Sequence, residues 1–433
     1  MPEAGALAGG YRGIVLDLDG VVYLGDEVVP AAPAALAGVR GLGVRLAFVT
    51  NNSSRPPERV VEKLGRLGVK AAVEEVVTSA DATVRLLGGE HGLRGTRVLV
   101  VGGPGLRQAL EAAGARLVAS SAWRQAEVVA VGFDPELTYD RLRAAALAIR
   151  AGARFVGSNP DTTLPMPDGS WPGAGATLAM LQAATGVRPE VAGKPEPALF
   201  ETAAEAIGPG PYLMVGDRAD TDLDGAHRLG WATALVLSGV LGPRDLPDLA
   251  IAPDHLLADV GGLLDPPGPA VRPATPADAP AVSGLLAAHR PAGASAGGDD
   301  RTAGPARGEP AATPASAAPD PAGRTGGDLV AVDGRRAVGA VAWRRRGERA
   351  VLSGPVVEAG CRGRLVGTRL LVAACIAARE AGLRRVAAPD HGFLRRFGFR
   401  PPDPGDPAGP DPGDPAGTRD PAAHHGLLVR DLR

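Results

Sequence analysis

GIVLDLDGVVYLGDE, residues 13–27, places the carboxylates of Asp17 and Asp19 directly after a run of branched apolar residues. Because side chains alternate along a strand, Asp17 and Asp19 point to the same side of it and Leu18 to the other. Gly20 lets the backbone turn away, which leaves both acids at the carboxyl end of a buried strand. Parallel sheets bind ligands at this edge. Two adjacent carboxylates repel each other, and a divalent cation such as Mg²⁺, which prefers oxygen ligands, removes that conflict.

The alternation of short apolar runs with helical segments continues from residue 11 to about residue 265. The apolar runs include VRLAFVT (44–50), RVLVV (97–101) and YLMVGD (212–217). Between them, segments such as PPERVVEKLGRLG (56–68) place apolar residues at helical spacing and end on glycine. This pattern predicts an α/β fold with a doubly wound parallel sheet, covered by helices on both faces. The units are too many for one sheet, so we expect a second α/β unit inserted into the first.

The composition of the chain limits its functions. Its 433 residues predict two or three domains, and its formal net charge of -2 predicts no nucleic-acid partner. No apolar run reaches the roughly 20 residues that span a bilayer, so we expect no membrane insertion, and the first residues lack the pattern of a signal peptide. Cys361 and Cys375 are the two cysteines, which indicates a reducing compartment without a disulfide framework. We therefore expect a cytoplasmic protein.

Three further segments carry polar residues of the same kind. VTNNSS (49–54) ends an apolar run on hydroxyl and amide donors, and AGKPEP (192–197) presents a lysine in a loop fixed by glycine and proline. VGDRADTD (215–222) ends another apolar run on a pair of acids, Asp217 and Asp222. The whole set supplies one carboxylate to attack, one to move a proton, others to hold a metal, and donors for a phosphate. It suits phosphoryl transfer through a covalent aspartyl-phosphate.

Each of these motifs has a simpler interpretation when it is taken alone. Asp217 and Asp222 could belong to an ordinary turn and a helix N-cap. Lys194 could be a solvated lysine on the surface. Because all four motifs stand in order at the ends of apolar runs, we favour the catalytic interpretation. VVGGPGLRQAL (100–110) is a poor dinucleotide loop, since Gln108 stands at the third glycine position, and we expect a strand-to-helix turn there.

DLDG, VTNN, GKP and GDRADTD, in this order and spacing, resemble the haloacid dehalogenase (HAD) superfamily of phosphatases. The segment at about 81–183 contains SNPDTTLPMPDG followed by PGAG. It is similar to the large α/β cap of subfamily IIA, which holds nitrophenylphosphatases and nucleotide, phosphoglycolate and pyridoxal phosphatases. The resemblance implies a phosphatase domain over residues 11–265. Its HAD core would cover 11–80 and 184–265, with the cap inserted between them.

The resemblance also implies roles for the site residues. Asp17 would be the nucleophile that attacks phosphorus, and Asp19 would protonate the leaving alkoxide and then activate water. Mg²⁺ would be held by the Asp17 carboxylate, the Asp19 backbone carbonyl and Asp217, with Asp222 in support. The residues implied to bind the phosphate group are Thr50, Asn51, Asn52 and Lys194. The cap residues that we expect to line the leaving-group pocket are Phe133, Asn159 and Asp161.

The composition changes after Pro266. Residues 291–327 contain no Val, Ile, Leu, Met or aromatic residue, and residues 401–424 contain DPGDPAG twice, so both stretches are predicted to be disordered. Between them lie short apolar runs and one long helical pattern, TRLLVAACIAAREAG (368–382). We expect a smaller α+β region over residues 270–433.

This C-terminal region resembles the GNAT acetyltransferase family in VRPATPADAPAVSGLLAAH (271–289), GPVVEAGCRGRLVGTRLL (354–371) and FLRRFGF (393–399). In that family, a loop that enters a long helix presents backbone N–H groups to the pyrophosphate of acetyl-CoA. This chain has Leu365 where the family's pattern has its first glycine, and Leu394 where a general-acid tyrosine often stands. We therefore expect weak or absent binding of acetyl-CoA.

A phosphatase of this type joined to a GNAT-like region is similar to the glycerol-3-phosphate phosphatases of actinobacteria. We expect a Mg²⁺-dependent phosphomonoesterase that acts on a small phosphorylated metabolite, glycerol 3-phosphate first. Other small phosphates (phosphoglycolate, a nucleotide or pyridoxal phosphate), a GNAT-type N-acetyltransferase with an accessory HAD domain, and a scaffold or acyl-CoA sensor are the alternatives. The sequence is compatible with a homo-oligomer. We expect the two domains to separate near residue 268.

Overall fold

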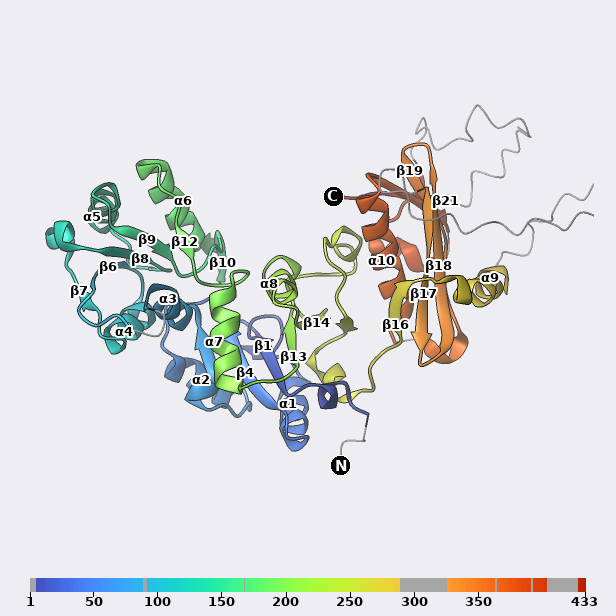
Figure 1. The fold of residues 1–433 in the computed structure, drawn as a ribbon, viewed down its shortest axis with the longest axis horizontal. Coiled ribbons are helices and arrows are strands. Elements are labelled where there is room, and N and C mark those ends of the chain that lie inside the picture. The colour runs from blue at the N-terminus through green and yellow to red at the C-terminus, as the bar shows by residue number, and fades with distance from the viewer. Residues whose placement is uncertain are drawn as a thin grey trace, which may run out of the picture. The chain divides into compact units, whose positions relative to one another are not determined.

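The computed structural model describes residues 5–88, 92–166, 168–288, 325–362, 364–390, 392–402 and 427–433. The chain forms two compact units (Figure 1). The first comprises Met1–Leu241 and Pro253–Pro267, and the second comprises Gly242–Ala252 and Gly268–Arg433.

The sequence boundary near residue 265 therefore needs one correction. Gly242–Ala252 lies inside the predicted phosphatase domain but folds with the second unit. The physical reason is burial: Leu246 and Leu249 of this segment are buried, and its short helix η6 (Leu246–Asp248) contacts helix α10 (Val366–Glu380).

The core of the first unit is a six-stranded parallel sheet in the order β15-β14-β13-β1-β4-β5. Its strands are β1 (Gly13–Asp17), β4 (Arg45–Thr50), β5 (Val76–Thr78), β13 (Tyr212–Gly216), β14 (Ala232–Val236) and β15 (His255–Leu257). Its helices are α1 (Ala32–Gly41), α2 (Pro57–Arg66), α3 (Ser79–Gly88), α7 (Pro197–Ile207) and α8 (Asp224–Arg228).

Both faces of this sheet are covered, as the continuous apolar runs predict. Ile14 and Leu16 of β1 pack on one face with residues of α1 and α2. Val15 packs on the other face with residues of α7 and α8. Every residue of β1 is buried, so the predicted doubly wound α/β core is confirmed.

The inserted cap has its own five-stranded parallel sheet in the order β12-β9-β8-β6-β7 (Figure 1). Its elements are β6 (Arg97–Val101), α4 (Pro104–Ala112), β7 (Arg116–Leu117), β8 (Val128–Val131), α5 (Tyr139–Arg150), β9 (Arg154–Gly157), α6 (Ala174–Thr185) and β12 (Glu190–Val191). Two hairpins join β10 (Thr163–Met166) to β11 (Gly169–Pro172) in the cap and β2 (Tyr23–Leu24) to β3 (Glu27–Val28) in the core. Strand β12 pairs with β9 and so belongs to the cap sheet. The cap sheet therefore extends beyond residue 183, where the cap was predicted to end.

The second unit is a six-stranded sheet, antiparallel except where β19 pairs with β20. Its strands are β16 (Ala270–Pro273), β17 (Gly326–Asp333), β18 (Arg336–Arg346), β19 (Arg349–Val357), β20 (Arg385–Pro389) and β21 (Leu427–Asp431). Helix α10 lies against one face and α9 (Ala279–Ala288) against the other (Figure 1). The predicted α+β region is confirmed.

The two stretches predicted to be disordered fall mainly on 291–324 and 403–424, which lie outside the described residues. One end of the first prediction is wrong. Gly326 and Gly327 begin β17, where they pair with Arg344 and Trp343. Glycine has no side chain that would indicate a strand, so the composition of this stretch did not predict the pairing of Gly326 and Gly327.

Short helical turns connect several of these elements. They are η1 (Leu7–Gly10), η2 (Val73–Glu75), η4 (Ser120–Gln125), η5 (Ala219–Leu223), η7 (Val260–Leu264), η8 (Pro276–Asp278), η9 (Ala359–Cys361) and η10 (Phe393–Phe397).

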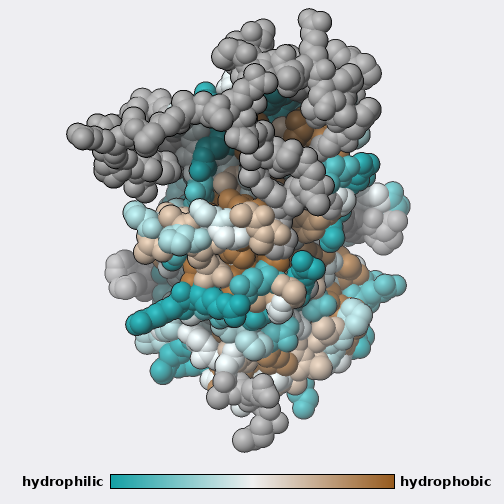
Figure 2. Space-filling view, turned by 90° about the vertical axis from the view of Figure 1, so that its right-hand side faces the viewer, coloured by the Kyte–Doolittle hydropathy of each residue, from teal (hydrophilic) through white to brown (hydrophobic). Residues whose placement is uncertain are grey.

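No helix in the described ranges is both long and apolar enough to span a bilayer. On the face shown in Figure 2, brown hydrophobic areas lie next to teal hydrophilic ones. The exposed large hydrophobic side chains among the described residues belong to the first unit and include Tyr139 and Val240. Single exposed hydrophobic residues are normal for a protein surface.

Candidate active site

The predicted acids meet at the carboxyl edge of the core sheet. Asp17 ends β1, Asp217 follows β13, and Thr50 ends the neighbouring strand β4. Because β1 lies between β13 and β4, the ends of the three strands are adjacent. Asp222 joins them from the π-helical turn η5, and one oxygen from each of Asp17, Asp217 and Asp222 lies within 4.8 Å of the others. All three side chains are buried.

Lys194 lies among these acids. Its Nζ is 2.8 Å from Asp17 Oδ1 and 2.7 Å from Asp222 Oδ1. Burial alone would lower the pKa of Lys194, but the Asp17 and Asp222 carboxylates outweigh it and raise this pKa above its usual value. The lysine is therefore a fixed positive charge beside Asp17, and the surface alternative does not apply because the side chain is buried.

The remaining negative charge is not balanced by one lysine. Burial and the Asp17 carboxylate raise the pKa of Asp217 to about 6, although the N–H of Val240 stabilises its charged form. Burial also raises the pKa of Asp222, in spite of its ion pair with Lys194. Raised carboxyl pKa values at a buried cluster indicate a place for a further cation.

Asp19 has a different environment from the three clustered acids. It is exposed to solvent, whereas Asp17, Asp217 and Asp222 are buried. Partial burial and the Asp17 carboxylate raise the pKa of Asp19 to about 6. A carboxyl group with a pKa near neutrality is suited to give and take a proton.

The turn after Asp19 and the Asp217 carboxylate are both held by a segment that no motif marks. Ser238 Oγ donates to the carbonyl of Gly20 (2.7 Å), and the N–H of Val240 donates to Asp217 Oδ2 (2.8 Å). Gly20 has a positive φ of 79°, and a side chain there would overlap Asp217. A side chain on Gly239 would overlap the same carboxylate. These contacts join residues about 220 and 23 positions apart, so the local sequence gives no signal for them.

The predicted phosphate-binding residues form a tight turn after β4. Thr50 Oγ1 accepts the N–H of Asn52 (3.1 Å), and Asn52 Oδ1 accepts the N–H and the hydroxyl of Ser54. The side chain of Asn51 binds the Lys194 loop: Oδ1 accepts the N–H of Lys194 (2.8 Å) and Nδ2 donates to its carbonyl (3.2 Å). Asn51 therefore fixes the position of the lysine.

Two of the three predicted cap residues reach the core at this turn. Asn159 Nδ2 donates to the carbonyl of Asn51 (2.6 Å), and Asp161 Oδ2 accepts from Asn51 Nδ2 (2.9 Å). Arg218, next to Asp217, lies 3.6 Å from Asp161. The third, Phe133, follows β8, and its carbonyl accepts the N–H of Gly103 within the cap.

A buried pair of hydroxyls adds to this contact between cap and core. Ser53 Oγ donates to Ser158 Oγ at 2.8 Å, and both side chains are buried. The sequence analysis did not single out either serine, although SNPDTT begins at residue 158.

Comparison with known proteins agrees with this geometry. The family model of haloacid dehalogenase-like hydrolases matches residues 14–116, and a HAD-hydrolase-like model matches residues 191–263. The acid sugar phosphatase of Staphylococcus aureus is 36% identical over 252 residues, 58% of this chain and 95% of that protein. This chain belongs to the haloacid dehalogenase-like hydrolases. The predicted family is confirmed, and the chain is a phosphatase.

Solved structures of HAD phosphatases are similar over different lengths. Glycerol phosphate phosphatase Rv1692 of Mycobacterium tuberculosis, in complex with magnesium, is 30% identical with a TM-score of 0.64, over 91% of this chain and 99% of that one. The 4-nitrophenylphosphatase of Thermotoga maritima is 32% identical with a TM-score of 0.55, over 60% of this chain and 98% of that one. An acetyltransferase (GNAT) family model matches residues 305–399, which confirms the predicted GNAT-like region.

The site of this HAD phosphatase fits the predicted Mg²⁺ cofactor. The cluster of Asp17, Asp217 and Asp222 offers oxygen ligands alone, the type that Mg²⁺ prefers over nitrogen or sulfur. The structure of the similar glycerol phosphate phosphatase Rv1692 has been solved in complex with magnesium. Among the described residues, this is the one group of acidic, histidine or cysteine side chains placed to hold a metal.

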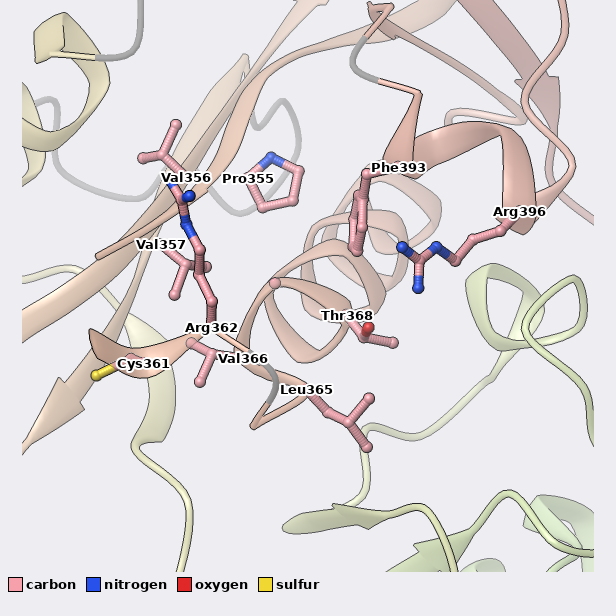
Figure 3. A pocket seen from close by; sticks show the side chains of 11 residues that line it. Pro355, Val356, Val357, Cys361, Arg362, Leu365, Val366, Thr368, Phe393 and Arg396 are labelled. Atoms are coloured by element: carbon pink, nitrogen blue, oxygen red, sulfur yellow. The ribbon is translucent and has the colours of Figure 1, made fainter. Parts of the chain in front are cut away.

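The GNAT-like unit carries a pocket of about 580 Å³ at the start of α10 (Figure 3). Pro355, Val356 and Val357 of β19 lie on one side of it, and Leu365, Thr368, Phe393 and Arg396 lie on the other. Leu365, where the GNAT pattern has glycine, precedes α10 with a positive φ of 54°. Leu394, where a general-acid tyrosine often stands, is fully buried. Leu365 therefore lines the pocket, whereas Leu394 does not.

Proposed function

We propose that this HAD phosphatase is a Mg²⁺-dependent phosphomonoesterase of small phosphorylated polyols, with glycerol 3-phosphate as its first candidate substrate. The observation that carries the proposal is the buried Lys194, which pairs with Asp17 and Asp222 beside Asp217. A carboxylate held next to a fixed positive charge and a metal-binding pair can approach a phosphate dianion, which an isolated carboxylate would repel.

In the proposed reaction, an oxygen of Asp17 attacks phosphorus while the bond from phosphorus to the substrate oxygen breaks. Asp19 gives its proton to that oxygen, so the alcohol leaves neutral. Asp19, now a carboxylate, takes a proton from a water molecule whose oxygen attacks the aspartyl-phosphate. The bond from phosphorus to Asp17 then breaks and inorganic phosphate leaves.

The cofactor and the donors share the charge of the phosphate. Mg²⁺ would be held by the Asp17 carboxylate, the Asp19 backbone carbonyl and Asp217, with Asp222 in support, and would offset the repulsion between Asp17 and the substrate. The groups proposed to bind phosphate oxygens are Thr50, Asn51, Asn52 and Lys194.

The cap supports a small substrate. It contacts the core through Asn51, Ser53 and Arg218 at the edge of the site, and a cap that closes there excludes water and large substrates. Two similar proteins are named as an acid sugar phosphatase and a glycerol phosphate phosphatase. Their substrates guide the choice among phosphoglycolate, nucleotides, pyridoxal phosphate and glycerol 3-phosphate. A cytoplasmic location and a homo-oligomer remain predictions.

The test is a phosphate-release screen over roughly 50 phosphorylated metabolites, with and without Mg²⁺. We expect glycerol 3-phosphate or another polyol phosphate among the leading substrates, and no release without a divalent cation. Glycerol 3-phosphate outside the leading few would overturn the substrate. Acetyl-CoA turnover without phosphate release would support the acetyltransferase alternative instead.

A further inference from the structure

The cap meets the core at the turn that follows β4, and the glycine-rich segment VVGGPG (100–105) takes part in this contact. The N–H of Gly105 donates to the carbonyl of Ser54 (2.9 Å), and a side chain on Gly105 would overlap the core backbone. A Cβ atom on Gly132 would lie 2.5 Å from Ser53 Oγ. No side chain fits at either glycine, so the cap approaches the turn closely.

Two polar side chains of the cap bind the same turn. Asn159, which is only 4% exposed, donates from Nδ2 to the carbonyl of Asn51 (2.6 Å). Its Oδ1 accepts the N–H of Asp161 (3.1 Å) and so holds the backbone that carries the Asp161 side chain. Asp161 Oδ2 accepts from Asn51 Nδ2 (2.9 Å), and Arg218 provides a positive charge 3.6 Å from the other oxygen. The Asp161 carboxylate is therefore fixed next to the Asn51 amide.

The Asn51 amide binds both backbone polar groups of Lys194. Its Oδ1 accepts the N–H of Lys194 (2.8 Å), and its Nδ2 donates to the carbonyl (3.2 Å). An amide has a donor end and an acceptor end, whereas a carboxylate only accepts. If the amide turned over, its oxygen would face both the Asp161 carboxylate and the Lys194 carbonyl, and both contacts would be repulsive. Asp161 therefore favours the one orientation in which Asn51 holds Lys194.

The loop that carries Lys194 also packs closely against the cap. A Cβ atom on Gly193 would lie 2.6 Å from Asn51 Oδ1 and 2.6 Å from the carbonyl of Ser158 in the cap. From this position, Lys194 Nζ lies 2.8 Å from Asp17 Oδ1. Catalytic groups depend steeply on geometry, and a displacement of about 1 Å can lower a rate by about 10²-fold. The placement of the lysine charge therefore depends on contacts that the cap makes.

We propose that Asp161 of the cap is a positioning residue of the phosphatase: through Asn51 it holds the backbone of Lys194, so that the lysine charge stands beside Asp17. The inference rests on the proposed roles of Asp17 and Lys194 in the reaction. It gives the cap a task in the chemical step, besides closing over the substrate. A residue that only lined the leaving-group pocket would distinguish between leaving groups, whereas a residue that positions Lys194 affects every substrate alike.

The experiment measures kcat/KM of the full-length Asp161→Ala variant with two leaving groups, in glycerol 3-phosphate and in nitrophenyl phosphate. We expect a fall of about 10- to 100-fold, because the lysine charge is misplaced. The factor should agree between the two substrates to within about 3-fold, because Lys194 acts on the phosphoryl group that they share. Hydrogen exchange at Gly193 and Lys194 should become faster.

A double-mutant cycle tests whether Asp161 acts through Asn51. Asn51→Ala removes the amide, so adding Asp161→Ala to it should change kcat/KM by no more than about 2-fold. Asp161→Asn keeps an acceptor for Asn51 Nδ2 and should remain within about 5-fold of the wild type. Asp161→Ser, whose Oγ stands one bond short of the carboxylate oxygens, replaces Asp161→Ala if the alanine variant does not fold.

Glu127→Ala is the matched control. Glu127 is a cap carboxylate that also binds a backbone N–H and an arginine: it accepts the N–H of Arg97 (2.9 Å) and pairs with its side chain at 3.3 Å. It precedes β8, so it lies at the opposite edge of the parallel cap sheet from Gly132 and Ser158, which follow β8 and β9. We expect Glu127→Ala to leave kcat/KM within about 2-fold of the wild type.

The proposal is overturned if Asp161→Ala leaves kcat/KM within about 2-fold of the wild type, or lowers it for one of the two substrates only. It is also overturned if the effects of Asp161→Ala and Asn51→Ala multiply, if Asp161→Asn loses as much as Asp161→Ala, or if Glu127→Ala loses as much. Failure of the proposed substrate looks different, because hydrolysis of nitrophenyl phosphate and its dependence on Asp161 would remain. Failure of the proposed reaction would leave the wild-type chain without phosphate release from either compound.

Discussion

Each unit of this chain has a candidate site at the end of a strand, β1 in the first and β19 in the second, but the two differ in the groups they present. The phosphatase site brings four charged side chains together, three acids and Lys194, all buried. The GNAT-like pocket is lined by Leu365 at the position of a glycine, and Leu394, at the position of a tyrosine, is buried outside the pocket lining. In both units the sheet and its covering helices are intact. A fold is maintained by many apolar contacts, whereas its chemistry depends on a few polar groups.

The largest expected effect is the loss of the proposed nucleophile, Asp17, in the first site. Asp17→Asn should lower kcat by roughly 10⁴-fold or more, because an amide does not attack phosphorus. Phosphate release at saturating substrate measures it. Asp26→Asn is the control, since Asp26 is fully exposed and lies outside the carboxylate cluster. Retention of more than about a hundredth of the activity in Asp17→Asn would contradict its role.

The second effect depends on the leaving group. Asp19→Asn should lower activity toward glycerol 3-phosphate by about 10² to 10⁴-fold, because its alkoxide needs a proton to leave. With nitrophenyl phosphate, whose leaving group needs no proton, the same substitution should lower the rate of aspartyl-phosphate formation much less. Rapid-mix measurement of nitrophenol release separates that step. An equal loss on both substrates would show that Asp19 is not the general acid.

A third test measures how much Mg²⁺ stabilises the folded protein through the first site. Mg²⁺ at about 100 times its Kd should raise the free energy of unfolding of the cooperative unit that binds it by about 2.7 kcal/mol, because it binds the buried carboxylates of the folded state. Thermal unfolding with and without Mg²⁺ measures this. Asp217→Asn should remove most of the increase. An increase unchanged in that variant would place the metal elsewhere.

In the second site, we expect calorimetry of the full-length chain to give no acetyl-CoA binding tighter than about 1 mM. Leu365→Gly should stabilise the unit by about 1 kcal/mol, because the backbone at this position has a positive φ that leucine adopts with strain. Denaturant unfolding of the wild type and of Leu365→Gly measures this difference in stability. Micromolar acetyl-CoA binding by the wild type would contradict the prediction that the second site does not bind this ligand.

The smallest effect concerns the two cysteines of the GNAT-like unit. Cys361 lines the pocket and is partly exposed, whereas Cys375 is buried in α10, where burial raises the pKa of its thiol to about 12. A thiol reagent should therefore modify Cys361 in the native protein and Cys375 only after unfolding. Acetyl-CoA should not slow the reaction of Cys361. Protection by acetyl-CoA would show that the pocket is occupied.

Local patterns were sufficient for the architecture and for placing three candidate site residues at one edge of the sheet. Apolar strands of β1, β4 and β13 end on polar residues, and parallel strands bring their carboxyl ends to one edge, so Asp17, Thr50 and Asp217 were predictable. The GNAT-like sheet was predictable for a similar reason, because alternating apolar runs identify strands.

The sequence by itself determined which residues stand at the strand ends, because strand alternation and apolar burial act over a few neighbouring positions. Only the tertiary structure decided what those residues contact. Asn51 binds the Lys194 loop, Val240 offers a backbone N–H to Asp217, and the loop tip at Asp248 belongs to the second unit. Backbone N–H groups are the same in nearly every residue, and these partners lie 23 to 185 positions apart. Such contacts leave no pattern in the local sequence, because they arise only when the sheets and loops have packed.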